Sequence, residues 1–140
     1  MATIKSYSDL QQSKKLSEIL PLENADMYYE EVCNLPKIIV GNYILHNQCM
    51  EDKDYKKLSN QVLSPAWSLA ALLNVLPNNE NISTNLSKGG YRISTLEYTN
   101  NWFVDYEDET DGLNNCVTSA DNPIDACYEM ILKLKEKNLL

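Results

Sequence analysis

The side chains best suited to catalysis or metal binding in this 140-residue sequence are its four cysteines and its single histidine. His46 and Cys49 are three positions apart, a spacing at which both can bind one zinc ion, with further ligands from Cys33 and from Cys116 or Cys127. A Cys49 thiolate activated by His46 could also act as a nucleophile. The sequence has only one such close pair and no marked third group to orient the histidine. We therefore expect buried free thiols, a surface histidine and no cofactor, with a zinc-binding protein or Cys/His enzyme as the alternative.

Carboxylates gather in the run DYEDETDG at residues 105–112. If Gly112 is the turn glycine of a calcium loop, Glu107 falls at the first position and Thr118 at the last, where such a loop needs aspartate and a bidentate glutamate. The run therefore predicts a solvated strand end with weak, nonspecific cation affinity at most. It is a better candidate for a patch that docks a basic protein partner. The carboxylates of this patch are Asp105, Glu107, Asp108, Glu109 and Asp111.

The overall charge restricts the class of partner. The net charge is −8 and Arg92 is the only arginine, so the sequence predicts no binding to nucleic acid or to an acidic membrane surface. The N-terminus has no apolar signal segment and no apolar run reaches the about 20 residues of a membrane span, which predicts a cytoplasmic protein with no membrane partner. In that compartment the cysteines stay reduced and the sequons at Asn81 and Asn85 stay unmodified. An acidic inhibitor that imitates nucleic acid is a second alternative, although the carboxylates are scattered outside one run.

The apolar segment SPAWSLAALLNVLP, residues 64–77, must be covered by other parts of the fold. Ser64 is a suitable N-cap and Pro65 suits the first helical turn, so the segment predicts a helix over residues 66–76. Because this helix is apolar nearly all round, we expect it at the centre of the domain, with the aromatic hairpin and the last helix packed against it.

Two amphipathic helices and two hairpins complete the predicted order helix, hairpin, helix, hairpin, helix. A capping box at Ser8 and Gln11 begins the first helix, and Asn122 with Pro123 begins the last, whose buried stripe includes Cys127. The expected strands flank a Gly-Asn turn at residues 41–42, flank a turn at residues 99–101, and include a short strand at 116–118. Residues 77–90 are expected as a loop, and the strand at 102–108 alternates, with Trp102, Val104 and Tyr106 on one face and Asp105 and Glu107 on the other. Residues 23–32 fit a short helix and a strand equally. This order predicts an α+β fold, a single domain over residues 1–140 with antiparallel hairpins packed on about three helices.

Three stretches, PAWSLAALLNVLP, WFVDY and DNPIDACYEMILKLKEKNLL, resemble small uncharacterised proteins of Bacteroidetes phages and integrated mobile elements. The resemblance implies a small intracellular protein of unknown activity, with no catalytic residues to carry over. The absence of glycine-rich phosphate loops, nucleophile elbows and HExxH motifs agrees with this. We therefore predict a non-enzymatic accessory or interaction protein that contacts an unknown protein partner. Its contact surfaces would be the acidic patch and the exposed part of an aromatic face around Tyr28, Tyr29 and Tyr43.

Overall fold

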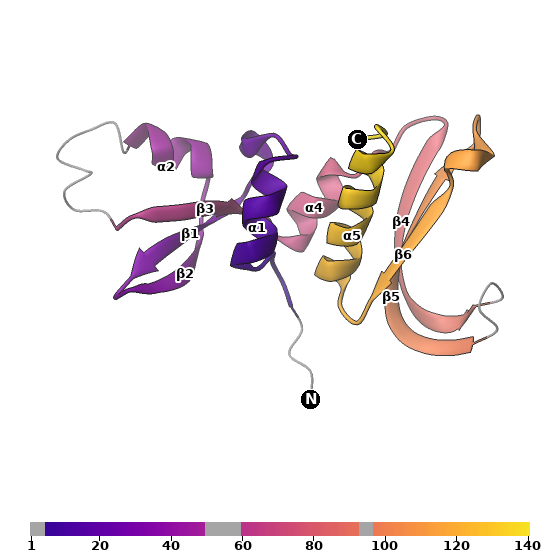
Figure 1. The fold of residues 1–140 in the computed structure, drawn as a ribbon, viewed down its shortest axis with the longest axis horizontal. Coiled ribbons are helices and arrows are strands. Elements are labelled where there is room, and N and C mark those ends of the chain that lie inside the picture. The colour runs from indigo at the N-terminus through magenta and orange to yellow at the C-terminus, as the bar shows by residue number, and fades with distance from the viewer. Residues whose placement is uncertain (1–4, 50–59, 93–96) are drawn as a thin grey trace. The chain divides into compact units, whose positions relative to one another are not determined.

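The computed structural model describes residues 5–49, 60–92 and 97–140, in which short helices accompany antiparallel strands (Figure 1). The strands form two three-stranded sheets. All strand pairs in both sheets are antiparallel, which confirms the predicted α+β class.

The chain divides into two compact units, which we describe separately. The N-terminal unit is Tyr7–Ala71, and the C-terminal unit is Leu72–Leu140 together with the first residues through Ser6. That the two units fold together as the one domain expected for residues 1–140 stays a prediction.

The N-terminal unit contains one sheet and several short helices. Its elements are α1 (Leu10–Ser17), η1 (Leu22–Asn24), β1 (Met27–Val32), β2 (Leu35–Val40), α2 (Tyr43–Cys49) and β3 (Val62–Ala66). The strand order is β2-β1-β3, so β1 is central. Tyr28 and Tyr29 are neighbours on β1 and point to opposite faces, and both are buried, at 9% and 8% exposure. The sheet is therefore covered on both faces.

The first hairpin turns at Cys33 and Asn34, not at residues 41–42 as predicted. Both turn residues have positive φ, 52° and 64°, the geometry of a two-residue turn between twisted antiparallel strands. The Gly-Asn pair instead precedes α2, where the Asn42 side chain accepts a hydrogen bond from the Leu45 N–H at 3.0 Å. The prediction was wrong because asparagine suits a helix N-cap as well as a tight turn.

The start of α1 is shifted by one residue from the prediction. Asp9 is the N-cap, and the Asp9 and Gln12 side chains each accept a bond from the other residue's backbone N–H. Ser8, the predicted cap, is fully buried and bonds to other buried groups.

The apolar segment begins as the end of a strand, β3, and continues into a helix, α4. Ser64 and Pro65 pair with β1 in the sheet, and β3 continues to Ala66. Proline is tolerated there because β3 is an edge strand. The helix α4 spans only Leu69–Val75, and the Ser68 hydroxyl accepts a hydrogen bond from the Ala71 N–H at 3.2 Å. The predicted helix over residues 66–76 therefore began three residues too early.

The C-terminal unit consists of a sheet and one long helix. Its remaining elements are β4 (Ile82–Arg92), β5 (Glu97–Asp108), η2 (Gly112–Asn114), β6 (Cys116–Ala120) and α5 (Pro123–Glu136). The strand order is β4-β5-β6, and α5 packs against β5 and β6 (Figure 1). Val104 and Tyr106 on β5 are buried, at 0% and 1% exposure, and Glu107 is exposed, as the predicted alternation requires. Phe103, on the same face as Glu107, departs from that alternation because it is buried too, at 8%.

The long hairpin differs from the prediction at its turn. Residues 99–101, expected as the turn, lie within β5, and the connection between β4 and β5 includes residues outside the described part of the chain. Residues 82–90, expected as a loop, belong to β4. Gly89 and Gly90 have positive φ at the point where the pairing register shifts, so these glycines form a bulge within the strand.

The last helix begins as predicted. The Asn122 side chain accepts a hydrogen bond from the Asp125 N–H at 2.9 Å, and Pro123 occupies the first helical position. Ile124, Cys127 and Ile131 are fully buried on the face of α5 that the sequence predicted. The predicted third strand is also present, as β6.

Candidate functional site

Cys33 and His46, two of the residues considered for a metal site, do not come together within the N-terminal unit. Cys33 is exposed in the β1–β2 turn, while His46 on α2 is 8% exposed and stacks on Tyr28, with the ring centroids 4.5 Å apart. The expected surface histidine is therefore buried. Tyr28 and Val32 are separated by about 13 Å along β1, and Cys33 lies beyond, so Cys33 and His46 cannot share one zinc ion. The Cys49 side chain lies outside the described residues, and among those described no group of three or more His, Cys, Asp or Glu is arranged to hold a metal ion.

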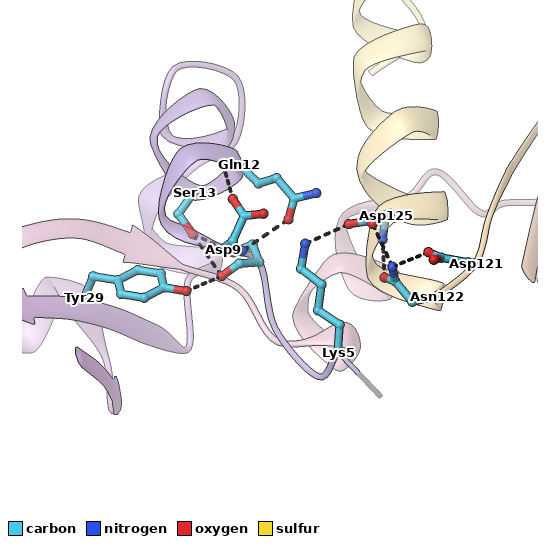
Figure 2. A network of polar contacts seen from close by, with 9 residues as sticks. Lys5, Asp9, Gln12, Ser13, Tyr29, Asp121, Asn122 and Asp125 are labelled. Atoms are coloured by element: carbon cyan, nitrogen blue, oxygen red, sulfur yellow. Dashed lines mark hydrogen bonds and ion pairs between the residues drawn. The ribbon is translucent and has the colours of Figure 1, made fainter. Parts of the chain in front are cut away.

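A buried group of hydroxyls in the N-terminal unit was not predicted (Figure 2). The Ser8 and Ser13 side-chain oxygens lie 2.7 Å apart, and the Tyr29 hydroxyl donates to the Ser8 carbonyl at 2.8 Å. The Trp67 backbone N–H donates to the Ser8 hydroxyl at 3.1 Å. Burial, with the neighbouring Tyr7 and Asp9, raises the pKa of Tyr29 to about 12, so its phenol stays neutral. Because none of these bonded groups is a base that could activate a serine, the group joins α1 to the sheet.

Figure 2 also shows the polar contacts at the start of α5 in the C-terminal unit. The Lys5 ammonium lies 2.8 Å from the Asp125 carboxylate, and the Asn122 amide donates to Asp125 at 2.7 Å and to Asp121 at 2.9 Å. Carboxylates at a helix N-terminus interact favourably with the helix dipole. These contacts stabilise the first turn of α5.

The acidic run forms a turn held by its own side chains, which we call the acidic turn, Asp108–Asn115. The Asp108 carboxylate accepts bonds from the Thr110 hydroxyl at 2.7 Å, the Thr110 N–H at 2.9 Å and the Asp111 N–H at 3.2 Å. These hydrogen bonds lower the pKa of Asp108 because they favour its charged form. The Asn115 side chain in turn accepts from the Asp108 N–H at 2.7 Å. The backbone of this turn is thus fixed at several points.

The second half of the acidic turn presents an apolar side chain. The Asp111 carboxylate accepts from the Leu113 N–H at 3.1 Å and from the Asn114 amide at 2.7 Å. These bonds hold η2, on which Leu113 is 92% exposed. The carboxylates of Asp108 and Asp111 therefore order a turn that carries an exposed leucine.

Other predicted patch residues lie along β5 beside this turn. Asp105 and Glu107 lie on the face of β5 opposite to Val104, and Asp105 pairs across the strands with Val117, which is 50% exposed. We call the predicted carboxylates together with Leu113 and Val117 the docking patch. It comprises Asp105, Glu107, Asp108, Glu109, Asp111, Leu113 and Val117. The sequence analysis missed its two apolar members, for which the only signal is a leucine and a valine among polar residues.

The predicted aromatic contact face is wrong in two of its three residues. Tyr28 and Tyr29 are buried in the N-terminal unit, and Tyr43 is half-buried. Among the residues that the structure describes, the exposed tyrosines are instead Tyr91 and Tyr98, at 60% and 76%, which pair with each other across β4 and β5.

Comparisons with family models, with curated proteins and with solved structures find no match to this chain. In the described ranges, no helix combines the length and apolar character that crossing a membrane requires.

Proposed function

We propose that this protein is a non-enzymatic interaction protein that binds a basic protein partner through the docking patch. The observation that carries the proposal is Leu113, 92% exposed on a turn that the Asp108 and Asp111 side chains hold in one conformation. Binding through an ordered turn loses little conformational entropy. An exposed leucine on such a turn can enter an apolar pocket of the partner and act as the anchor of the interface.

The carboxylates of the docking patch define the charge of the partner. Five acidic side chains lie within residues 105–111, in a chain whose net charge is −8. A lysine- or arginine-rich surface is attracted to such a patch from a distance, which raises the association rate at low salt. The exposed Glu107 and Glu109 would contribute mainly to this rate, because exposed ion pairs add little to affinity. An origin in a phage or mobile element and a cytoplasmic location remain predictions.

Selection of short random peptides displayed on phage tests the proposal while the natural partner is still unidentified. We expect the wild-type protein to enrich peptides that combine lysine or arginine with one large apolar residue. These peptides should lose binding to Leu113→Ser and should bind Glu107→Gln/Glu109→Gln with a slower association rate. The double variant leaves Asp108 and Asp111, and hence the turn, unchanged.

Leu45→Ser is the matched control, because Leu45 is also an exposed leucine, at 60%, and lies in the N-terminal unit. Enriched peptides that bind Leu113→Ser as well as wild type, or a selection that favours acidic peptides, would refute the proposal.

A further inference from the structure

The strand β6 lies at the edge of the sheet of the C-terminal unit and carries part of the docking patch. Among the described strands it pairs with β5 alone, and Val117 of the patch lies on it, 50% exposed. A sheet edge can accept a further strand, because its outward backbone groups have no partner within the sheet. The edge strands β2 and β3 contain Pro36 and Pro65, whereas β6 has no proline. Every residue of β6 therefore keeps the N–H that an added strand needs.

The register shows which backbone groups of β6 face outward. The Asp108 N–H of β5 points toward β6, because it donates to the Asn115 side chain at 2.7 Å. In an antiparallel pair the groups that face the neighbouring strand belong to every second residue, so those of Tyr106 also face β6. Cys116, the partner of Tyr106 in the register, faces β5 in return. By the same alternation, the outward groups of β6 are those of Val117 and Ser119.

These outward groups are available for hydrogen bonds. Among the described residues, none accepts a hydrogen bond from the Val117 or the Ser119 N–H. The Val117 carbonyl accepts one bond from the Lys133 ammonium, at 3.4 Å. Because a carbonyl oxygen has two lone pairs, this bond leaves room for a second. The edge therefore offers the N–H and the carbonyl of both outward residues to an added strand.

The carboxylate beside Val117 indicates the charge that an added strand must carry. Asp105 stands opposite Val117 on β5, with both side chains on the same face of the sheet. A residue of the added strand opposite Val117 would lie on that face too, two strand spacings, or about 10 Å, from Asp105. A lysine or arginine there can lay its aliphatic stem along the half-exposed Val117 and bring its charge to the carboxylate. An acidic strand would be repelled by this group and by the net charge of −8.

The exposed Leu113 fixes the order of residues in the added strand. It lies on η2, which precedes β6 in the chain, so it lies beyond the end at which β6 begins. A strand antiparallel to β6 runs toward this end. An apolar residue that contacts Leu113 must therefore follow the lysine or arginine, by roughly two to four residues.

From this register and charge we infer that the partner of the docking patch is an extended basic segment of another protein, which adds to the sheet as a fourth strand antiparallel to β6. Its lysine or arginine lies opposite Val117, and a large apolar residue follows toward Leu113. Backbone bonds to the outward groups of β6 supply affinity, and the alternate side chains supply specificity. This inference rests on the proposed function, because it specifies the form in which the basic partner binds.

Amide hydrogen exchange measured by NMR on the full chain, with and without a peptide enriched in the phage selection, tests the proposed bonds. We expect the Val117 and Ser119 amides to exchange at least about tenfold more slowly when the peptide is bound. The Cys116 and Thr118 amides, which face β5, are internal controls and should change little. If a peptide requires Leu113 but leaves exchange at Val117 and Ser119 unchanged, this inference is wrong and the proposed function stands. If no basic peptide is enriched, both are wrong.

Peptides methylated at one backbone nitrogen at a time supply a second test, on the unchanged protein. Methylation removes an N–H, and in an added strand the N–H of every second residue faces β6. We expect binding to weaken about tenfold at these alternate positions, which include the residue opposite Val117, and to change little at the positions between them. Weakening at every third or fourth position, as for a bound helix, or at no position would refute strand addition.

A matched pair of variants tests the same bonds from the side of the protein. Ser119→Pro removes an outward N–H from an exposed position of an edge strand, where proline is tolerated, and Ser119→Thr keeps that N–H. We expect Ser119→Pro to bind the enriched peptides about tenfold more weakly and Ser119→Thr to resemble wild type. Equal binding by the two variants would contradict the pairing. Should Ser119→Pro fail to fold, the methylated peptides still decide with wild-type protein.

Discussion

Replacing Tyr29 with phenylalanine removes one hydroxyl from a ring that is 8% exposed. The hydroxyl donates to the Ser8 carbonyl at 2.8 Å, and the Ser13 hydroxyl also approaches this carbonyl, at 3.4 Å. The variant therefore loses one buried hydrogen bond. The Ser8 carbonyl still accepts the longer and weaker bond from the Ser13 hydroxyl. We expect Tyr29→Phe to lower the free energy of unfolding by about 1 kcal/mol at neutral pH.

The destabilising effect of the same substitution disappears at high pH. The pKa of Tyr29 is raised from 10.0 to about 12 in the folded protein, so the unfolded chain loses its phenolic proton first. Wild-type stability therefore falls as the pH rises from about 10 to about 12, because the unfolded state binds fewer protons than the folded state. At pH 11 a pKa shift of this size lowers the free energy of unfolding of the wild type by about 1.4 kcal/mol, which offsets the stabilisation by the hydrogen bond. Phenylalanine has no such proton, so the two proteins should be equally stable near pH 11.

Urea unfolding followed by far-ultraviolet circular dichroism measures both proteins from about pH 8 to about pH 11. The difference between them isolates Tyr29, because every other titrating group is present in both. Tyr91→Phe is the matched control, since Tyr91 is 60% exposed, and it should match wild type at every pH. A difference between Tyr29→Phe and wild type that stays constant over this range would refute the assigned role of the Tyr29 hydroxyl.

Three further predictions concern local features of the fold. Burial raises the pKa of Cys127 to about 12, so its thiol should be unreactive in the native protein near neutral pH. Alkylation followed by peptide mass mapping should therefore find the label on exposed Cys33, and on Cys127 only after the chain unfolds. Asn122→Ala should lower the free energy of unfolding in urea by about 1 kcal/mol, because it removes the side-chain cap of α5, and an unchanged value would contradict that cap. Hydrogen bonds from Thr110 lower the pKa of Asp108 from its ordinary value of 3.8, so the acidic turn should be stable above pH 3.8 and should loosen as the pH falls through the lowered pKa. The chemical shift of the Thr110 amide in an NMR titration reports this change, and a midpoint at or above 3.8 would contradict the prediction.

The sequence predicted best those elements whose local sequence pattern fits only one type of structure. An Asn-Pro entry with period-3.6 apolar positions identified the start of α5 and its buried face, and alternation over residues 104–107 identified Val104 and Tyr106 as core. The errors fall where one signal fits two structures. Ser64 and Pro65 suit a helix start, but pairing with β1 places them in an edge strand. Pairing between distant segments decides such cases, and no local pattern contains it.

In the candidate site, too, the sequence predicted some features and not others. The acidic run could be located from composition, and its poor match to a calcium loop could be read from spacing. The sequence did not reveal that Asp108 and Asp111 bind their own backbone N–H groups and leave Leu113 exposed, because aspartate adopts several local hydrogen-bonded turns. The burial of His46 against Tyr28 likewise depends on α2 folding over the sheet.

Charge determines how binding through the docking patch should respond to salt. The patch attracts a basic partner, so added salt should slow that association. A salt series read by peptide binding therefore reports the contribution of the carboxylates, because screening acts on charges and leaves the apolar contact of Leu113 in place.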